Sequence, residues 1–389
     1  MTNESNPSRV DDPPSVEPRA VVTVPDGEPV KKERPQKELR RRASKILHFL
    51  AAMFLFILAI QLMKKGAQAV APDLEGTFPF DNGVSTLGLG WLGAYLVLSG
   101  SPVAAVALSL FAAGATTRIQ TFTMLTGSRL GASFIVLLVG FLYAMRSHNR
   151  RESVGMGVLA LSMTAIVYVP GMFLAYGLLK SGALEGVQWQ ASSELNGVID
   201  AVWGPIVSLA DRLLPGPLLL ILGLGVILGS FKLLDMVLPS LDGERHAESR
   251  GHWLKKPWPM FFLGMLAALL TLSVSVALTV LVPLAAKGYI RREEAIPYIA
   301  GANITTLADT LVAAMILGNP VGVQVVLAEA IGVAVITLLL LAFAYRPLQT
   351  TVMALDEWIV ATTPRLVAFV AILFLMPIGL LFSGRIVGM

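Results

Sequence analysis

The chain has 389 residues, of which 55% are apolar and only 14% are charged. Soluble domains carry about 25% charged residues, so this composition predicts an integral membrane protein with several spans. Because cysteine is absent, disulfides, thiolate metal sites and cysteine nucleophiles are excluded. The net charge of +4 is accounted for by basic residues that flank spans on the cytoplasmic side, and no nucleic-acid partner is expected.

Residues 1–43 are polar and Pro-rich, with too few large apolar side chains to offset the entropy of chain ordering. We therefore expect a disordered basic tail. Three arginines, Arg40, Arg41 and Arg42, adjoin the first hydrophobic run. By the positive-inside rule they place the N-terminus in the cytoplasm and the protein in the cell membrane, plasma or inner, with the lipid bilayer as its partner.

Seven hydrophobic runs predict transmembrane helices, because a helix needs about 20 residues to cross the bilayer core. They lie at residues 46–63, 131–146, 154–179, 213–238, 304–317, 320–344 and 364–383. A polar connector is expected at about residues 64–84, and an acidic extracytoplasmic loop at residues 181–212.

Two further apolar runs, residues 86–115 and 258–288, break at segments rich in hydroxyl groups. Either each run makes two ordinary spans joined by a tight turn, or each forms a re-entrant hairpin with its tip inside the membrane. The arms are too short to cross a bilayer untilted, which favours the hairpin. Non-helical backbone at membrane depth is tolerated only inside protein or beside a wet cavity, so the tips should be buried.

The two broken runs belong to an internal duplication with a constant offset of 174 residues, the distance from Ser101 to Ser275. Repeat 1 would cover residues 44–180 and repeat 2 residues 213–353, while residues 354–389 add a C-terminal transmembrane helix. Each repeat crosses the membrane three times, so the second starts from the opposite face and the repeats are inverted. The identical pairs at this offset are Gly90 with Gly264, Leu92 with Leu266, Leu96 with Leu270, Leu98 with Leu272, Ser99 with Ser273, Ser101 with Ser275, Leu110 with Leu284, Ala112 with Ala286, Gly114 with Gly288 and Gly127 with Gly301.

Hydroxyl side chains gather where the two helical runs break, at Ser99, Ser101, Thr271, Ser273 and Ser275. A broken helix exposes N–H groups that favour an anion and carbonyl groups that favour a small cation such as Na⁺. Alternatively, Ser and Thr in transmembrane helices bond back to their own backbone. The second explanation does not predict the same break in both repeats, so the pattern favours a binding site.

The second repeat carries a more specific pattern at residues 275–284 (SVALTVLVPL), 288–297 (GYIRREEAIP) and 301–306 (GANITT). This pattern resembles the sodium-dependent phosphate cotransporter family, the type II Na/Pi cotransporters. The resemblance covers about residues 45–345 and is strongest in the second repeat. It implies two inverted repeats, each with a Gln-Ser-Ser-Ser hairpin followed by a Gly-Ala-Asn-Ile-Gly-Thr-Thr-like stretch, and it implies sodium-coupled phosphate transport.

The resemblance assigns Asn303, Thr305 and Thr306 to the site of the second repeat, although the family's glycine before the paired threonines is missing. In the first repeat, Ser128 and Arg129 stand in the matching places, with Arg129 at that of the motif Asn. Leucine stands where both hairpins of the family carry Gln. These leucines are Leu98 and Leu272.

Three charged residues lie in or near the apolar runs. Arg129 can hold a phosphate or carboxylate through two hydrogen bonds, or its side chain can extend to the membrane interface. Asp309, inside a span, is predicted to ligate Na⁺ or to carry a proton. The alternative is a structural ion pair, and inverted repeats would bring Arg129 to Asp309 as its partner. Glu329, inside another span, is a candidate for the same role as Asp309.

The sequence thus predicts an all-α membrane protein with inverted repeats, a secondary transporter that couples sodium to inorganic phosphate or a related anion by alternating access. Two alternatives stay open: a transporter of another solute, proton-coupled through Asp309, and a non-transporting membrane sensor or scaffold. Because no P-loop or HExxH motif is present, we expect neither enzyme activity nor a cofactor besides the coupling ion Na⁺. The predicted binding residues are Ser99, Ser101, Ser128, Arg129, Thr271, Ser273, Ser275, Asn303, Thr305, Thr306 and Asp309.

Overall fold

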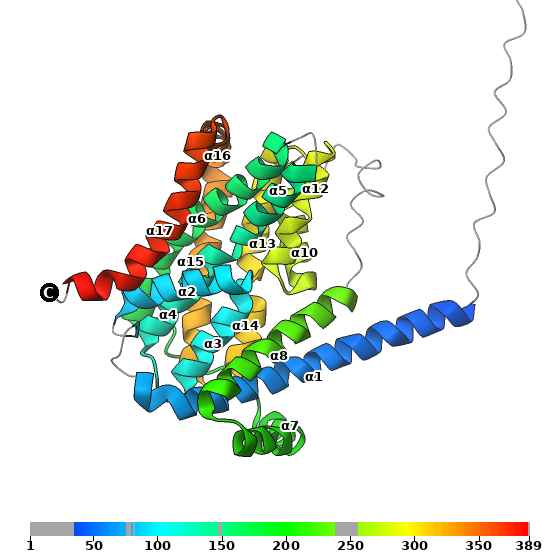
Figure 1. Ribbon diagram of the computed structural model, residues 1–389, viewed down its shortest axis with the longest axis vertical. Helices are drawn as coiled ribbons and strands as arrows, with labels where there is room; N and C mark the ends of the chain where they lie inside the picture. The colour runs from blue at the N-terminus through cyan, green and yellow to red at the C-terminus, as the bar shows by residue number, and fades with distance from the viewer. Residues whose placement is uncertain (1–34, 75–78, 81, 147–149, 238–255, 388–389) are drawn as a thin grey trace, which may run out of the picture. The chain divides into compact units, whose positions relative to one another are not determined.

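The computed structural model describes the chain apart from six short or terminal gaps (Figure 1). The described residues are 35–74, 79–80, 82–146, 150–237 and 256–387. The chain divides into two units, Met1–Ala43 and Ser44–Met389, and the helices below belong to the second except for the beginning of the first helix. Most of the predicted disordered tail lies outside the described residues, and from Pro35 onward it is helical.

The described residues form helices joined by short connections, without a β-strand among them. In chain order the helices are α1 (Pro35–Leu74), α2 (Gly83–Val97), α3 (Gly100–Ala112), α4 (Arg118–Ala132), α5 (Phe134–Arg146), α6 (Arg150–Ser181), α7 (Ser193–Leu213), α8 (Gly216–Val237), α10 (Pro257–Thr271), α11 (Val274–Thr279), α12 (Leu281–Ala286), α13 (Arg292–Thr305), α14 (Ala308–Ile316), α15 (Pro320–Phe343), α16 (Tyr345–Val360) and α17 (Thr363–Val387). The predicted all-α class is therefore confirmed.

Seven helical segments of the described chain are long and apolar enough to cross a membrane. They are Ala43–Leu74, Arg118–Met145, Arg151–Ser181, Gly216–Leu234, Arg292–Ile316, Pro320–Phe343 and Thr363–Ser383. Each overlaps one of the seven predicted runs in order, which confirms a multipass membrane protein. The two broken runs appear instead as pairs of shorter apolar helices, α2 with α3 and α10 with α11 and α12.

The spans predicted at residues 131–146 and 304–317 are wrong at their beginnings. The first starts at Arg118 with α4, and the second starts at Arg292 with α13. Polar side chains at the centre of each span, Arg129 among them, lower the local hydropathy and hide the first half of the helix from a hydropathy reading. These polar residues are also candidate site residues.

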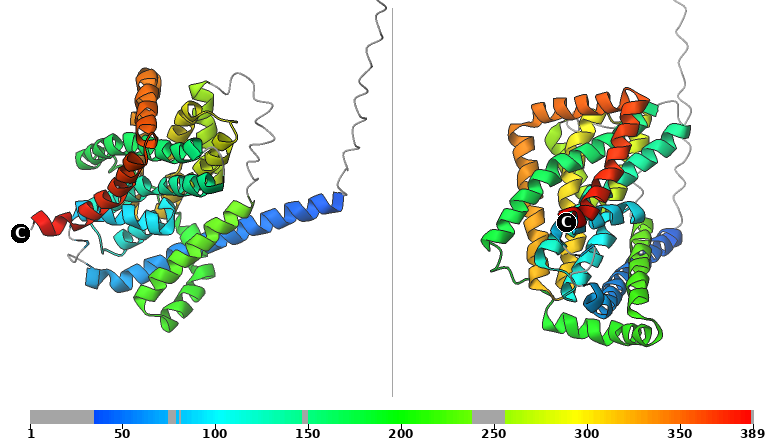
Figure 2. Two further views of the ribbon diagram at one scale, coloured as in Figure 1. Left: turned by 45° about the horizontal axis from the view of Figure 1, so that its top comes forward. Right: turned by 60° about the vertical axis from the view of Figure 1, so that its left-hand side comes forward.

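Two segments predicted to be irregular are largely helical. Helix α1 continues through most of the predicted connector to Leu74. Within the predicted loop at residues 181–212 lies α7, whose N-terminus is capped by Ser192, because its Oγ accepts a hydrogen bond from Leu195 N at 3.2 Å. Apolar residues of α7 recur at helical spacing, as expected for an amphipathic helix. Figure 2 shows α7 and α16 lying crosswise at opposite ends of α15.

Close helix packing recurs at the repeat offset. A Cβ added to Gly90 of α2 would lie 2.0 Å from the carbonyl oxygen of Met124 in α4. A Cβ added to Gly264 of α10 would lie 2.0 Å from the carbonyl oxygen of Tyr298 in α13. Both glycines therefore allow a backbone approach that no other residue permits. Because both partners of each pair are 174 residues apart, the structure supports the duplication.

Helices α4 and α13 run in opposite directions along α6. At the start of α4, Arg118 Nη2 donates to the carbonyl oxygen of Leu179, near the end of α6, at 2.9 Å. At the start of α13, Arg292 Nε lies 3.1 Å from Glu152 Oε2, near the beginning of α6. Side chains from the ends of α4 and α13 both hydrogen-bond to Thr164, midway along α6. The two helices therefore approach the middle of α6 from its opposite ends.

Candidate functional site

The breaks in the two apolar runs have the same backbone conformation. Leu98 ends α2 and Leu272 ends α10, with φ angles of 56° and 46°. Non-glycine residues seldom adopt this left-handed region because Cβ crowds the carbonyl oxygen, and among the described non-glycine residues these two alone have a positive φ. Ser99 and Ser273 then follow in extended conformation, with φ of −159° and −152°. The same strained break therefore occurs at equivalent places in both repeats.

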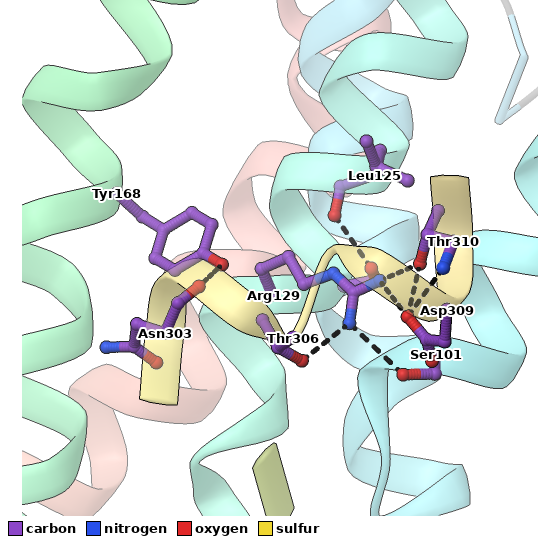
Figure 3. Close-up of polar contacts among 9 residues, drawn as sticks. Ser101, Leu125, Arg129, Tyr168, Asn303, Thr306, Asp309 and Thr310 are labelled. Carbon is purple, nitrogen blue, oxygen red and sulfur yellow. Dashed lines mark hydrogen bonds and ion pairs between the residues drawn. The ribbon is translucent and has the colours of Figure 1, made fainter. Parts of the chain in front are cut away.

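Arg129 lies at the centre of a polar cluster that joins the two halves of the chain (Figure 3). Its Nη1 donates to Ser101 Oγ and to Thr306 Oγ1, both at 3.2 Å, and its Nη2 donates to Thr310 Oγ1. Nη2 also lies 3.8 Å from Oδ1 of Asp309. The side chain is 1% exposed, so it does not extend to the membrane interface. A buried positive charge is thus held between α3 and the α13–α14 segment.

Asp309 supplies the negative charge of this cluster. Its Oδ1 accepts hydrogen bonds from the backbone N–H and the hydroxyl of Thr310, at 2.6 Å and 3.0 Å. Its Oδ2 has no hydrogen-bond partner among the described residues. Asp309 also lines, with Leu272 and residues of α1 and α8, a mainly apolar cavity of about 90 Å³. The expected pairing with Arg129 is therefore present, and one carboxylate oxygen is left for a further ligand.

Asn303 occupies the position equivalent to Arg129 and belongs to a second polar cluster. Its Nδ2 donates to Thr164 Oγ1 at 3.2 Å, and its carbonyl oxygen accepts from Tyr168 Oη at 2.9 Å (Figure 3). Thr164 also shares a hydrogen bond of 2.7 Å with Ser133, which follows the end of α4. Hydroxyl groups of α6 thereby hold the ends of α4 and α13 together.

Both helix breaks reach the last turns of α4. Ser101 accepts from Arg129, and Ser275 Oγ donates to the carbonyl oxygen of Ala132 at 3.4 Å. These two equivalent serines are each 7% exposed. The expectation that the tips are buried in the protein is therefore confirmed for Ser101 and Ser275.

The remaining predicted hydroxyls do not join the Arg129 cluster. Ser99 makes no capping hydrogen bond through its side chain. The others bind nearby backbone groups, as the alternative interpretation of such residues expects. Their hydrogen bonds are Ser128 Oγ to Leu125 O at 2.7 Å, Thr271 Oγ1 to Ala267 O at 2.8 Å, Thr305 Oγ1 to Met265 O at 2.9 Å, and Val276 N to Ser273 Oγ at 3.3 Å.

Two residues in these clusters were missed by the sequence reasoning. Thr310 follows Thr306 by four residues, the spacing that brings side chains onto one face of a helix. Tyr168 lies within a span, where a hydroxyl group needs a partner because lipid offers none. Both signals are visible in the sequence, and either one would have extended the predicted site.

Glu329 of α15 lies buried in the same region. Its side chain is 0% exposed, and neither carboxyl oxygen has a hydrogen-bond partner among the described residues. Arg129 and Tyr168 are within electrostatic reach of it, and Thr126 lies beside it. Glu329 therefore has the burial expected of its predicted role but takes no part in the Arg129 hydrogen bonds.

A second charged cluster joins the beginnings of α6 and α13 to α16. Arg292 contacts Glu152 through Nε and pairs with Asp356 Oδ2 through Nη1. Burial raises the pKa of the Asp356 carboxyl from 3.8 to about 7, although the guanidinium of Arg292 opposes this shift. Gly155 leaves the necessary space, because a Cβ there would lie 2.8 Å from Arg292 Nη1. Asp356 is therefore expected to titrate near neutral pH.

No protein-family model, curated protein or solved structure matches the chain. Among the described residues, no three His, Asp or Glu side chains gather as a bound metal ion would require. The function must therefore be inferred from the polar clusters around Arg129 and Asn303.

Proposed function

We propose that the protein is a secondary active transporter that carries inorganic phosphate, or a related small oxyanion, together with sodium by alternating access. The observation that carries this proposal is Arg129, a wholly buried cation that contacts side chains from both halves of the duplicated chain. Charged groups inside membrane proteins are costly, and they mark substrate and ion pathways.

The course of the helices supports an inverted arrangement of the repeats. Because α4 and α13 run in opposite directions along α6, the two broken runs would enter from opposite sides of the membrane. Transporters built in this way bind substrate and coupling ion near the bilayer midplane, where discontinuous helices of the two repeats meet. The contacts of Ser101 and Ser275 with the last turns of α4 fit such a meeting point.

Anion binding would use the guanidinium of Arg129, which suits the paired oxygens of a phosphate or carboxylate. In this structure Asp309 balances its charge from 3.8 Å, a separation too long for a good hydrogen bond. An incoming oxyanion would displace Asp309 from Nη2. The hydroxyl groups of Ser101, Thr306 and Thr310 lie close enough to donate to its remaining oxygens.

Coupling follows from the same exchange of partners. Once an anion holds Arg129, the carboxylate of Asp309 is buried without a positive neighbour, which is unfavourable. A sodium ion at the unpartnered Oδ2, beside the 90 Å³ cavity, would restore the balance of charge. Anion and cation would therefore bind more tightly together than alone. Rocking of one repeat against the other would then expose the loaded site to the other side.

Radiolabelled phosphate uptake into proteoliposomes tests this proposal, with inward gradients of Na⁺, K⁺ or H⁺ compared. We expect uptake to be driven by Na⁺, to be lost in Arg129→Gln, and to lose its Na⁺ dependence in Asp309→Asn. Ser181→Ala, which removes an exposed hydroxyl bonded within its own helix, is the matched control. Uptake under none of the gradients from a folded, monodisperse sample would reject phosphate transport, and Na⁺-driven uptake by Asp309→Asn would reject the role of Asp309.

A further inference from the structure

Glu329 is a buried carboxyl group that the proposed ion exchange does not use. We infer that Glu329 is a proton-binding site, protonated in this conformation and open to exchange with water when the molecule changes conformation. Its consequence for transport rests on the proposed function, whereas the protonation itself does not. Four observations about its surroundings carry this inference.

The first observation is the absence of any donor for an ionised carboxylate. Glu329 is 0% exposed, and neither of its oxygens has a hydrogen-bond partner among the described residues. An ionised carboxylate moved out of water without donors is very unfavourable, and such a group takes up a proton instead. The neutral acid carries no charge that needs to be balanced.

The second observation is the balance of charge around Glu329. Of the helices packed against α15, α4 brings Arg129, α6 brings Tyr168 and α14 brings Asp309 to this region. Within the described chain, α3, α13 and α16 place no titratable group in electrostatic reach of Glu329. The region thus holds one guanidinium and two carboxyl groups. With Asp309 ionised beside Arg129, a proton on Glu329 makes the buried set neutral.

The third observation is that Arg129 is already engaged. Its Nη1 and Nη2 donate to three hydroxyl groups, and Asp309 lies 3.8 Å away as its counter-ion. The guanidinium therefore has no second carboxylate to neutralise in this arrangement. Glu329 stays within its electrostatic field but outside its hydrogen bonds.

The fourth observation distinguishes a proton from a metal cation. Hard cations such as Ca²⁺ and Mg²⁺ collect about six or more oxygen ligands, whereas the hydroxyl beside Glu329 is that of Thr126. The Thr126 hydroxyl already donates to the carbonyl oxygen of Phe122 at 3.0 Å, so its oxygen is left to accept. A protonated Glu329 can act as that donor, and an ionised one cannot.

The transport consequence concerns where the proton comes from and where it goes. A proton from water on the side to which the site opens would bind a carboxyl oxygen of Glu329. After the conformational change it would leave to water on the other side. Phosphate uptake would then respond to an inward proton gradient as well as to sodium.

Infrared spectroscopy of the purified protein at pH 7 tests the protonation directly. All variants carry Asp356→Asn, because Asp356 is the other carboxyl expected to titrate near this pH. We expect a carboxylic-acid C=O band that moves in D₂O, disappears in Glu329→Gln, and persists in Asp309→Asn and Glu329→Asp. A spectrum without this band, a band unchanged in Glu329→Gln, or one that never shifts in D₂O would overturn the inference.

Transport separates this inference from the proposed function. We expect an inward proton gradient to stimulate wild-type phosphate uptake severalfold, and Glu329→Gln to lose that stimulation while it still exchanges internal for external phosphate. Proton stimulation that survives in Glu329→Gln would contradict the role of Glu329 in the cycle. If the wild type moves no phosphate, the proposed function fails, and the infrared band alone decides whether Glu329 holds a proton.

Discussion

At the scale of single residues, the pair of Arg129 and Asp309 determines what the buried centre can bind. Arg129→Gln would leave the Asp309 carboxylate buried without a cation, and removing one partner of a buried ion pair costs about 3–5 kcal/mol. We therefore expect Arg129→Gln to lower the free energy of unfolding by about this amount, and the double variant with Asp309→Asn to recover much of it. Unfolding in detergent measures each corner of this cycle. Strictly additive losses would show that the two residues do not interact.

Asp356 gives the molecule a pH dependence outside the membrane spans. Its carboxyl has a pKa near 3.8 in the unfolded chain and about 7 in the folded protein. Between these values the folded state binds more protons, so stability falls as pH rises from about 4 to 7 and changes little above that. We expect Asp356→Asn to flatten this slope in thermal unfolding followed across pH. Glu357→Gln, at the exposed neighbouring position, should keep the wild-type slope.

At the scale of helices, glycine positions control how closely the broken runs pack. Gly90→Ala and Gly264→Ala each place a Cβ against a backbone oxygen at 2.0 Å, so α2 must move from α4 and α10 from α13. We expect each change to lower the free energy of unfolding by about 1–3 kcal/mol, as overpacking does. Gly177→Ala in α6 meets open space and should be neutral or slightly stabilising. Equal thermal midpoints for all three variants would contradict this packing.

Most of the helices could be predicted from the sequence, and the failures have identifiable causes. Long apolar runs and the constant offset indicate the spans and the two breaks, because lipid exposure requires continuous apolar surface. The beginnings of α4 and α13 could not be read from hydropathy, since Arg129 and Asn303 interrupt it. Helix α7 contains Gly204 and Pro205, residues typical of turns, and its amphipathic pattern was therefore assigned to a loop.

The contacts that build the candidate site could not be read from the chain beyond a general expectation. An offset of 174 residues relates equivalent positions but does not say which side chains touch. The hydrogen bonds from Arg129 to Thr306 and Thr310 depend on how α4 packs against the α13–α14 segment, which is a property of the folded molecule. The pairing of Arg129 with Asp309 was foreseen because two opposite charges inside a membrane protein tend to meet.

At the scale of the whole molecule, seven spans and a cytoplasmic N-terminus predict that α7 lies outside and α16 inside. The natural chain has no cysteine, so single cysteines introduced at exposed positions report their side without background. We expect Asp200→Cys in α7 to react with an impermeant maleimide in intact cells, and Glu357→Cys in α16 to react only after permeabilisation. Labelling of both positions from the same side would contradict the proposed topology.

The difference between Arg129 and its repeat equivalent Asn303 has a consequence for the resting state of the molecule. In a carrier with perfect two-fold symmetry, exchanging the conformations of the two repeats would turn one facing state into the other at equal energy. Here the geometry is duplicated but the charge is not, because one half contributes a guanidinium where the other contributes an amide. The unloaded molecule must therefore favour one side of the membrane, and its forward and reverse rates must differ.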